Sequence, residues 1–397
     1  MKSKSILLFY SFAILLLLLV LSNTLHISPD EAKIVFSQNY LGRIIGIFLS
    51  FFGQSDLSLR LFFVILHIIN IWLVYLISLK IVKKEIYALL SAVVYSLLPG
   101  VLSSALIVNE AGIVIFLTLL FIYIYQNKKF GKKAYLLFPV MLLADNSFAI
   151  FFLSLFFFSL KKKDRLLIFL SLLFFGLSMY LFGFDASGKP RNYFLETFGI
   201  YSAVFSPLLF LYFFYTIYRI LVKEEKDIVW YISFVSFAFA LLLSFRQRIH
   251  LEDFAPFAVI ALPLMVKVFM NSYKVRIAEH RKKHKLLFAI VAVSLILNDL
   301  VLFFNKPLYY LFENPKRHFA YKFHISKPLA DSLKKMGIYC VKTSDKTLQK
   351  QLRFYGICEK GPFILNKYKI NKKAKKVSIR YKNITLETFY VSKINNK

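Results

Sequence analysis

The chain has 397 residues, of which 58% are hydrophobic and only 18% are charged. This composition excludes a soluble protein of this size. Because the apolar residues come in blocks of about 18 or more, it predicts a protein that crosses a membrane several times. The formal net charge of +31 could suit nucleic acid, but basic loops on one side of a membrane explain it better. We therefore predict no nucleic-acid partner.

Eleven membrane-spanning helices are predicted, with the N-terminus inside. The first, in "MKSKSILLFYSFAILLLLLVLSNTL", is interpreted as an uncleaved helix, because its apolar stretch is longer than that of a signal peptide and no small-residue cleavage site follows. Residues 134–160 form either two short helices that turn at 144–147 or one long helix. The predicted spans are 6–25, 61–81, 87–107, 111–126, 134–146, 147–160, 166–184, 204–222, 228–245, 255–271 and 286–304.

The distribution of basic residues tests this topology. Segments predicted inside carry 23 of the 52 Lys and Arg residues, whereas the short outer loops carry seven. Lys and Arg concentrate on the cytoplasmic side of membrane proteins, so the asymmetry supports the predicted orientation. It places the protein in a cell inner membrane, with residues 305–397 on the periplasmic side.

The long first outer loop, residues 26–60, contains "EAKIVFSQNYLGRIIGIFLSFFG", in which apolar residues recur at helical spacing with few charges. This pattern predicts helices that lie at the membrane surface. We expect them to cover a cavity that opens toward lipid. The fold class is therefore an all-α polytopic membrane domain, residues 1–304, with interfacial helices in its first outer loop.

Acidic residues recur in the outer loops, close to predicted membrane boundaries. Ionisable groups near the hydrocarbon edge often mark a site. Any one of them is equally explained as a solvated loop acid. The candidates, including one neighbouring histidine in "RIHLEDF", are Asp30, Glu31, Glu110, Asp145, His250, Glu252 and Asp253.

The outer loops also carry a few cations, Lys189 and Arg191 in "GKPRNY" and Arg246 and Arg248 in "SFRQRIHLEDF". Arg presents a fork of donors that suits phosphate oxygens, and a carboxylate opposite a bound phosphate could accept a proton from an attacking hydroxyl. These residues predict an extracytoplasmic site for a phosphate-bearing lipid and a hydroxyl or amine acceptor. Internal salt bridges between Arg248 and the following acids are the alternative explanation.

The tail, residues 305–397, is mixed and polar and predicts a small extracytoplasmic α/β domain. It contains both cysteines, Cys340 and Cys358, which in an oxidising periplasm are either a disulfide pair or free. Two cysteines without a nearby histidine pair do not make a zinc site. The absence of a phosphate-binding loop motif from the sequence argues against ATP-driven transport.

The acidic pair after the first helix lies in "SPDEAKI". It is followed in order by "SDLSLRLFFVILHIINIWLVYLISLKI", "SSALIVNEAGIVIFLTLLFIYIY", "FRQRIHLEDFAPFAVIALPLM" and "SKPLADSLKKMGIYCVKTSDKTLQKQLRFYG". These stretches resemble the GT-C glycosyltransferases, and among them the dolichyl-phosphate-mannose–protein mannosyltransferase and aminoarabinose transferase type, with the acidic pair the most specific. The resemblance covers most of the chain through short motifs.

The resemblance implies transfer of a sugar from a polyprenyl-phosphate donor to a lipid, glycan or protein acceptor on the outer face. It implies that Asp30, with Glu31 beside it, is the base or the group that positions the acceptor. Arg191, Arg246 and Arg248, with Lys189, are the candidates for holding the donor phosphate. Glu110, Asp145, His250, Glu252 and Asp253 are acceptor-binding or auxiliary candidates.

The sequence departs from the family pattern at Asp145, in "LADNSFAIFF", where many relatives have a Lys-Gly element. His250 stands near a position that is often aromatic, where it either contacts phosphate or is structural. No cofactor is predicted, because the match is better to metal-independent members, although the acids could hold a divalent ion. The alternatives are a transporter or flippase of lipid-linked saccharides, and a non-catalytic scaffold.

Overall fold

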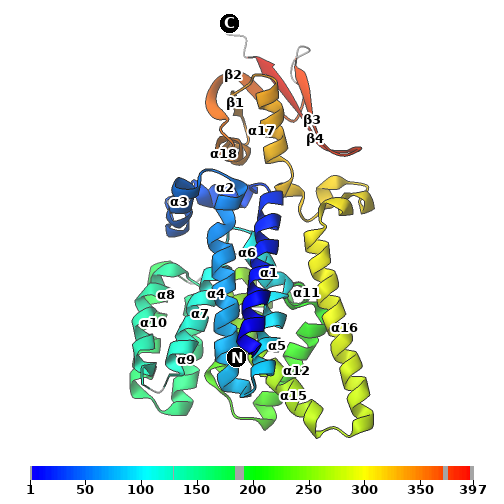
Figure 1. Cartoon of the computed structure of the whole chain (residues 1–397). Helices are drawn as coiled ribbons and strands as arrows, with labels where there is room; N and C mark the ends of the chain where they lie inside the picture. The colour runs from blue at the N-terminus through cyan, green and yellow to red at the C-terminus, as the bar shows by residue number, and fades with distance from the viewer. Residues whose placement is uncertain (1, 128, 184–191, 370–373, 394–397) are drawn as a thin grey trace. The chain divides into compact units, whose positions relative to one another are not determined.

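The computed structural model describes residues 2–127, 129–183, 192–369 and 374–393 (Figure 1). These residues form two compact units. The first consists of Met1–Leu15, Ile65–Ala105 and Asn109–Asp299, and the second of Leu16–Val64, Leu106–Val108 and Leu300–Lys397. The second unit therefore groups the first outer loop with the C-terminal part. The predicted domain boundary after residue 304 stays a prediction.

Within the described residues, five helices are long and apolar enough to cross a membrane, or up to eight if each bent pair of helices is one span. The five are Ser3–Thr24, Asp56–Val82, Arg165–Phe182, Ala255–Val275 and Glu279–Phe303. They correspond to α1 (Lys2–Thr24), α4 (Asp56–Val82), α10 (Arg165–Phe182), α14 with α15 (Ala255–Val259 and Leu262–Val275), and α16 (Ala278–Phe303). The polytopic helical architecture is confirmed, and the count of eleven spans stays a prediction.

Aromatic packing holds much of the first unit together. Phe121 of α7 (Ala111–Tyr125) packs edge-on against Phe151 of α9 (Phe148–Lys162) and stacks on Phe138 of α8 (Phe138–Ala144). Such ring pairs contribute beyond the area they bury. Close packing matters most between helices in lipid, where no difference in hydrophobicity drives association. Helix α9 also packs on α10 and on α13 (Ile228–Ser244).

Residues 134–160 form two helices, as one of the two predicted alternatives had it. The short helix η1 (Gly131–Leu137) leads into α8, which ends at Ala144. Asp145 then adopts an extended conformation, and its Oδ1 accepts a hydrogen bond from Ser147 N at 2.8 Å. This local turn competes with helix continuation, and α9 begins at Phe148.

Two bends were not predicted. The span predicted at 87–107 is divided into α5 (Glu85–Ser96) and α6 (Pro99–Leu106), which are bent by 61°. Ahead of α12 (Pro207–Lys223) lies an additional helix, α11 (Phe194–Phe205), at 105° to it. Proline begins the second helix of each pair because it cannot continue the preceding one. Ser206, with φ of 76°, makes the second bend.

In the second unit, the first outer loop forms α2 (Pro29–Val35) and α3 (Tyr40–Phe52), which are bent by 88°. Both lie in the segment where interfacial helices were predicted. Helix α2 begins with a capping box, in which Ser28 Oγ accepts from Glu31 N at 3.2 Å and Glu31 Oε2 accepts from Ser28 N at 2.8 Å. The cap turns the Glu31 side chain back over the helix start.

The C-terminal part is a mixed α/β fold, as predicted. Its sheet has the order β1-β2-β4-β3. Strands β1 (Cys340–Thr343) and β2 (Cys358–Asn366) are parallel and connected through α18 (Lys346–Phe354), whereas β3 (Lys375–Tyr381) and β4 (Ile384–Lys393) form an antiparallel hairpin. Helices α17 (Ser326–Lys335) and α18 contribute Leu329, Leu333 and Leu352 to its core. Cys340 and Cys358 are joined by a disulfide.

Gly42 allows α3 to lie close to the end of α2. A Cβ atom at Gly42 would stand 2.6 Å from Ile34 O and 2.7 Å from Ser37 O, whereas a Cβ at Gly46, one turn later, would meet nothing within 4 Å. We expect Gly42→Ala to lower the melting temperature of the purified protein, because backbone carbonyls cannot move aside as a side chain can.

Gly46→Ala is the matched control. It changes the same residue type on the same helix, and its better helix propensity should leave the melting temperature unchanged or slightly higher. Equal melting temperatures for the two variants in thermal unfolding would contradict the close approach of α2 and α3.

Candidate active site

A fully buried ion pair lies at the start of the first outer loop. Arg60 Nη2 donates to Glu31 Oε2 at 2.9 Å and to Oε1 at 3.1 Å, and neither side chain is exposed. Glu31 Oε1 also accepts from Val108 N at 3.1 Å. A buried charge pair needs such additional hydrogen bonds to offset its desolvation. Glu31 therefore has its carboxylate oxygens fully engaged inside the protein.

The same Arg60 side chain closes the end of α1. Its Nη1 donates to Leu25 O at 2.6 Å and to Ser22 O at 3.2 Å, and its Nη2 donates to His26 O at 3.1 Å. The last carbonyls of a helix have no partner within the helix, so this guanidinium satisfies them. Arg60, which belongs to α4, thus fixes both the end of α1 and the start of α2.

Asp30, the neighbour of Glu31, points the opposite way. It occupies the second position of α2, and 66% of its side chain is exposed. Its Oδ1 accepts from Lys33 Nζ at 2.9 Å, and Lys322 Nζ lies 3.9 Å from Oδ2. Exposed ion pairs of this kind contribute little stability and exchange readily. The Asp30 carboxylate can therefore be approached by a ligand, whereas that of Glu31 cannot.

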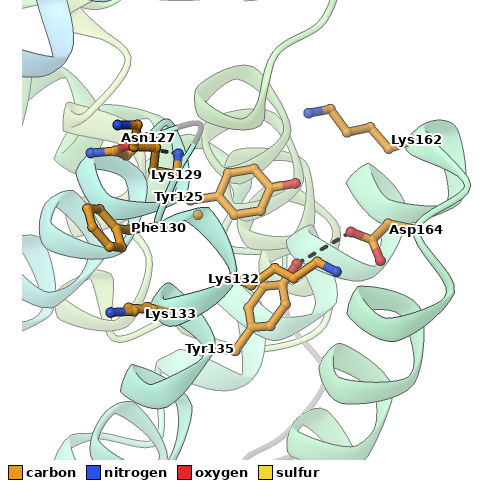
Figure 2. Close-up of a pocket in the computed structure, with 10 residues that line it drawn as sticks. Tyr125, Asn127, Lys129, Phe130, Lys132, Lys133, Tyr135, Lys162 and Asp164 are labelled. Atoms are coloured by element: carbon orange, nitrogen blue, oxygen red, sulfur yellow. Dashed lines mark hydrogen bonds between the residues drawn. The ribbon is translucent and has the colours of Figure 1, made fainter.

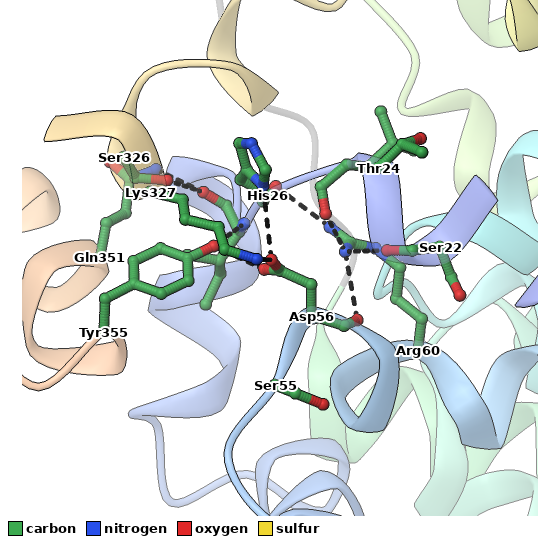
Figure 3. Close-up of polar contacts among 12 residues, drawn as sticks. Ser22, Thr24, His26, Ser55, Asp56, Arg60, Ser326, Lys327, Gln351 and Tyr355 are labelled. Atoms are coloured by element: carbon green, nitrogen blue, oxygen red, sulfur yellow. Dashed lines mark hydrogen bonds and ion pairs between the residues drawn. The ribbon is translucent and has the colours of Figure 1, made fainter. Parts of the chain in front are cut away.

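Asp56 joins the first outer loop to the C-terminal part (Figure 3). Its side chain is fully buried. It accepts hydrogen bonds from Tyr355 OH at 2.5 Å and from Lys327 Nζ at 3.0 Å, and His26 Nδ1 lies 3.3 Å away. Burial and the adjacent Asp56 carboxylate raise the pKa of Tyr355 above its ordinary value, so the phenol stays a donor at neutral pH.

The backbone of Ile27 strengthens the same junction. Its carbonyl accepts from Gln351 Nε2 at 2.7 Å and from Ser326 Oγ at 3.0 Å. Its N–H donates to Tyr355 OH at 3.0 Å. Helices α17 and α18 are thus hydrogen-bonded to the turn that leads into α2.

In the first unit, four predicted site residues come together from three separate loops. Glu110 precedes α7, Asp145 lies between α8 and α9, and Glu252 and Asp253 lie in the short helix η2 (Leu251–Asp253). Burial, a hydrogen bond with Asp145 and the negative charges of Asp145, Glu252 and Asp253 raise the pKa of Glu110 to about 7. The Glu110 carboxyl therefore gains or loses a proton near neutral pH.

The predicted cations are arranged differently. Arg248 Nη2 lies 2.6 Å from Glu196 Oε1, and 73% of the Arg248 side chain is exposed. Arg246 and His250 are exposed in the same connection after α13. Lys189 and Arg191 lie outside the described residues. Among the described residues, no group of three or more His, Cys, Asp or Glu side chains is placed to hold a metal ion, and the metal-independence of the protein stays a prediction.

Sequence reasoning missed several buried polar groups. Arg60 and Asp56 were not among the predicted site residues, although their four-residue spacing places them on one face of α4. Asp299 was not among them either. It is 3% exposed on α16, and its carboxylate oxygens have no hydrogen-bond partner within the described residues. A buried acid inside a membrane helix marks a functional candidate.

Solved structures of another protein have a similar fold. No protein-family model matches the sequence, and no curated protein matches it. The solved structure of ArnT from Cupriavidus metallidurans bound to undecaprenyl phosphate matches with a TM-score of 0.62 and 10% identity, covering 100% of this chain and 99% of that one. The apo state of the same protein matches with a TM-score of 0.56 and 13% identity, covering 90% and 75% of the two chains.

The chain has the ArnT fold. This confirms the predicted architecture of a helical membrane part with a small C-terminal sheet. At 10–13% identity the likeness establishes the ArnT fold and leaves the reaction to be argued from the side chains of this chain.

The buried ion pair gives a first prediction for the site. Glu31→Gln leaves the Arg60 guanidinium buried without a counter-charge, which typically costs about 3–5 kcal/mol. We expect a melting temperature several degrees below that of the wild type in detergent. Asp30→Asn is the matched control, one residue away, and should leave the melting temperature unchanged. Equal stability of Glu31→Gln and wild type would show that the pair does not hold the loop.

The raised pKa of Glu110 gives a second prediction. The contribution of Glu110 to stability is fully present below the ordinary pKa of a glutamate and is lost as the pH rises through about 7. Above pH 7 the ionised Glu110 carboxylate is repelled by the negative charge of Asp145, which is one cause of the raised pKa. Asp145→Asn removes this repulsion, and we expect it to raise the melting temperature at pH 8 more than at pH 5. A pH-independent effect of the substitution would contradict the pairing.

Proposed function

We propose that this protein is a glycosyltransferase that moves a sugar from a polyprenyl-phosphate donor to a lipid, glycan or protein acceptor on the outer face of the membrane. The observation that carries the proposal is the exposed Asp30 carboxylate, held at the start of α2 by the buried Glu31–Arg60 pair in a chain with the ArnT fold. The matching ArnT structure contains undecaprenyl phosphate, which supports a polyprenyl-phosphate donor.

In the proposed reaction an acceptor hydroxyl or amine attacks the anomeric carbon of the donor sugar. The bond between that carbon and the phosphate oxygen breaks, and polyprenyl phosphate leaves with the electron pair. Asp30 is exposed enough to accept the proton that the acceptor loses. Glu31, which has no exposed surface, is assigned a positioning role through Arg60.

Further residues are assigned supporting roles. Arg246 and Arg248 are proposed to hold the donor phosphate, since both are exposed and a guanidinium matches phosphate oxygens. Lys189 and Arg191 keep their predicted role in holding the donor phosphate, and His250 keeps its predicted acceptor-binding or auxiliary role. We propose that Glu110 gives up and takes up a proton during the reaction, because its pKa of about 7 suits general acid–base catalysis near neutral pH.

We propose that Asp145, Glu252 and Asp253 bind the acceptor. Their negative charges help to raise the pKa of Glu110. No metal or other cofactor is included in the proposed reaction. The placement of the reaction on the periplasmic side of an inner membrane rests on the asymmetry of Lys and Arg along the sequence.

One observation favours a second candidate function, the transport of lipid-linked saccharides. Asp299 is a buried acid on a helix long enough to cross the membrane, and such residues mark substrate and proton pathways in transporters. A transporter would depend on Asp299 and tolerate Asp30→Asn. A transferase of the proposed kind would depend on Asp30.

The proposal is tested by mass spectrometry of membrane lipids and surface glycans from a strain that lacks the protein. The strain is complemented with wild type, Asp30→Asn or Asp331→Asn at equal membrane abundance. Asp331→Asn is the control, because it neutralises an exposed acid on α17. We expect one sugar-sized mass difference to return with wild type and Asp331→Asn and to be lost at least tenfold with Asp30→Asn. Full restoration by Asp30→Asn would overturn the proposed role of Asp30.

A further inference from the structure

A basic pocket of about 470 Å³ lies in the first unit, and none of its lining residues is assigned to the reaction (Figure 2). It is formed where α7 ends, η1 begins, α9 ends and α10 begins. Four lysines line it: Lys129, Lys132, Lys133 and Lys162. The topology predicted from the sequence places these segments at the inner surface of the membrane.

The charge of the pocket favours an anion. Asp164 is the only carboxylate among the described lining residues, and its oxygens are engaged by the protein. Its Oδ1 accepts from Leu167 N at 3.2 Å as the N-cap of α10, and its Oδ2 accepts from Tyr135 OH at 3.4 Å. Asp164 therefore offsets only part of the positive charge that the four lysines present.

Aromatic rings set the positions of two of these lysines. Lys133 Nζ lies 4.5 Å from the centroid of the Phe130 ring, and Lys162 Nζ lies 5.5 Å from that of Tyr125. An ammonium group over an aromatic ring is attracted by the negative face of the ring. These contacts hold the ammonium groups beside the pocket instead of leaving them free in solvent.

The backbone of the pocket is also specifically built. Gly131 lies so close to the end of α7 that a Cβ there would stand 2.9 Å from Tyr125 O. Glycine thus lets the chain fold back directly after α7, which brings Lys132 and Tyr135 toward Asp164 and Lys162, as Figure 2 shows. The general preference for Lys and Arg on the inner side of the membrane would be met by lysines anywhere in these loops. It does not explain why the chain folds back to form a pocket.

Apolar surface beside the pocket indicates a lipid rather than a free anion. Phe130 is 48% exposed, and Leu136 and Val140, which follow in η1 and α8, are 76% and 52% exposed. Aromatic and aliphatic side chains next to lysines at the ends of membrane helices are typical of the headgroup region. We propose that this pocket binds the phosphate of an anionic phospholipid headgroup, with the acyl chains against the neighbouring apolar side chains.

The test measures lipid binding by the purified full chain in neutral detergent. Dioleoyl phosphatidylglycerol, dioleoyl phosphatidylcholine and inorganic phosphate are compared by native mass spectrometry and by the shift in melting temperature. We expect phosphatidylglycerol to be retained at least tenfold better than phosphatidylcholine and to raise the melting temperature. Inorganic phosphate should have no effect at the same concentration.

The pocket variant Lys132→Gln/Lys133→Gln/Lys162→Gln should lose this preference at least tenfold. The control Lys282→Gln/Lys283→Gln/Lys285→Gln removes the same charge from exposed lysines at the start of α16 and should keep it. The triple Lys→Arg variant at the three pocket positions should also keep it, which separates loss of charge from loss of folding.

Equal losses in the pocket and control variants would overturn the proposal in favour of diffuse charge attraction. A wild-type protein that retains phosphatidylcholine as well as phosphatidylglycerol would overturn it without reference to any variant. An equal response to inorganic phosphate would show an anion site that is not specific for lipid.

Discussion

The buried pair of Glu31 and Arg60 is the interaction on which the geometry of the second unit depends. Two opposite charges with no exposed surface are costly to bury, and additional hydrogen-bond partners offset that cost. Here the partners are the last carbonyls of α1, the N-cap of α2 and the backbone at Val108. The end of α1, the start of α2 and the Val108 backbone, which is 77 residues from Glu31 in sequence, are thus held to this one ion pair, and Asp30 is left facing outward beside it.

The C-terminal part depends on this turn as well. Asp56, one helical turn before Arg60, accepts from Lys327 and Tyr355, and the Ile27 carbonyl accepts from α17 and α18. A small α/β fold with a core of its own is thereby attached through polar contacts to the loop that carries Asp30. We infer that it stabilises the loop, and its Lys322 Nζ also lies 3.9 Å from Asp30 Oδ2.

Much of the architecture could be predicted from the sequence, because long apolar blocks and the distribution of Lys and Arg report membrane spans directly. The different roles of Asp30 and Glu31 were readable in principle from Ser28 and Glu31, whose spacing is that of a capping box. The Glu31–Arg60 pair was not, since the two residues are 29 positions apart. Nor was the convergence of Glu110 and Asp145, which needs α7, α8 and α9 to pack. The bend before α12 depends on the unusual conformation of Ser206.

The central claim is that an exposed acid in this fold serves sugar transfer from a polyprenyl phosphate. It is tested most directly by ³¹P NMR of purified protein incubated with polyprenyl-linked lipids and acceptor membranes from its own host. Transfer converts the phosphodiester of the donor into the phosphomonoester of polyprenyl phosphate. We predict that the monoester signal grows with wild type and not with Asp30→Asn. Growth at the same rate with both proteins, or with neither, would contradict the account.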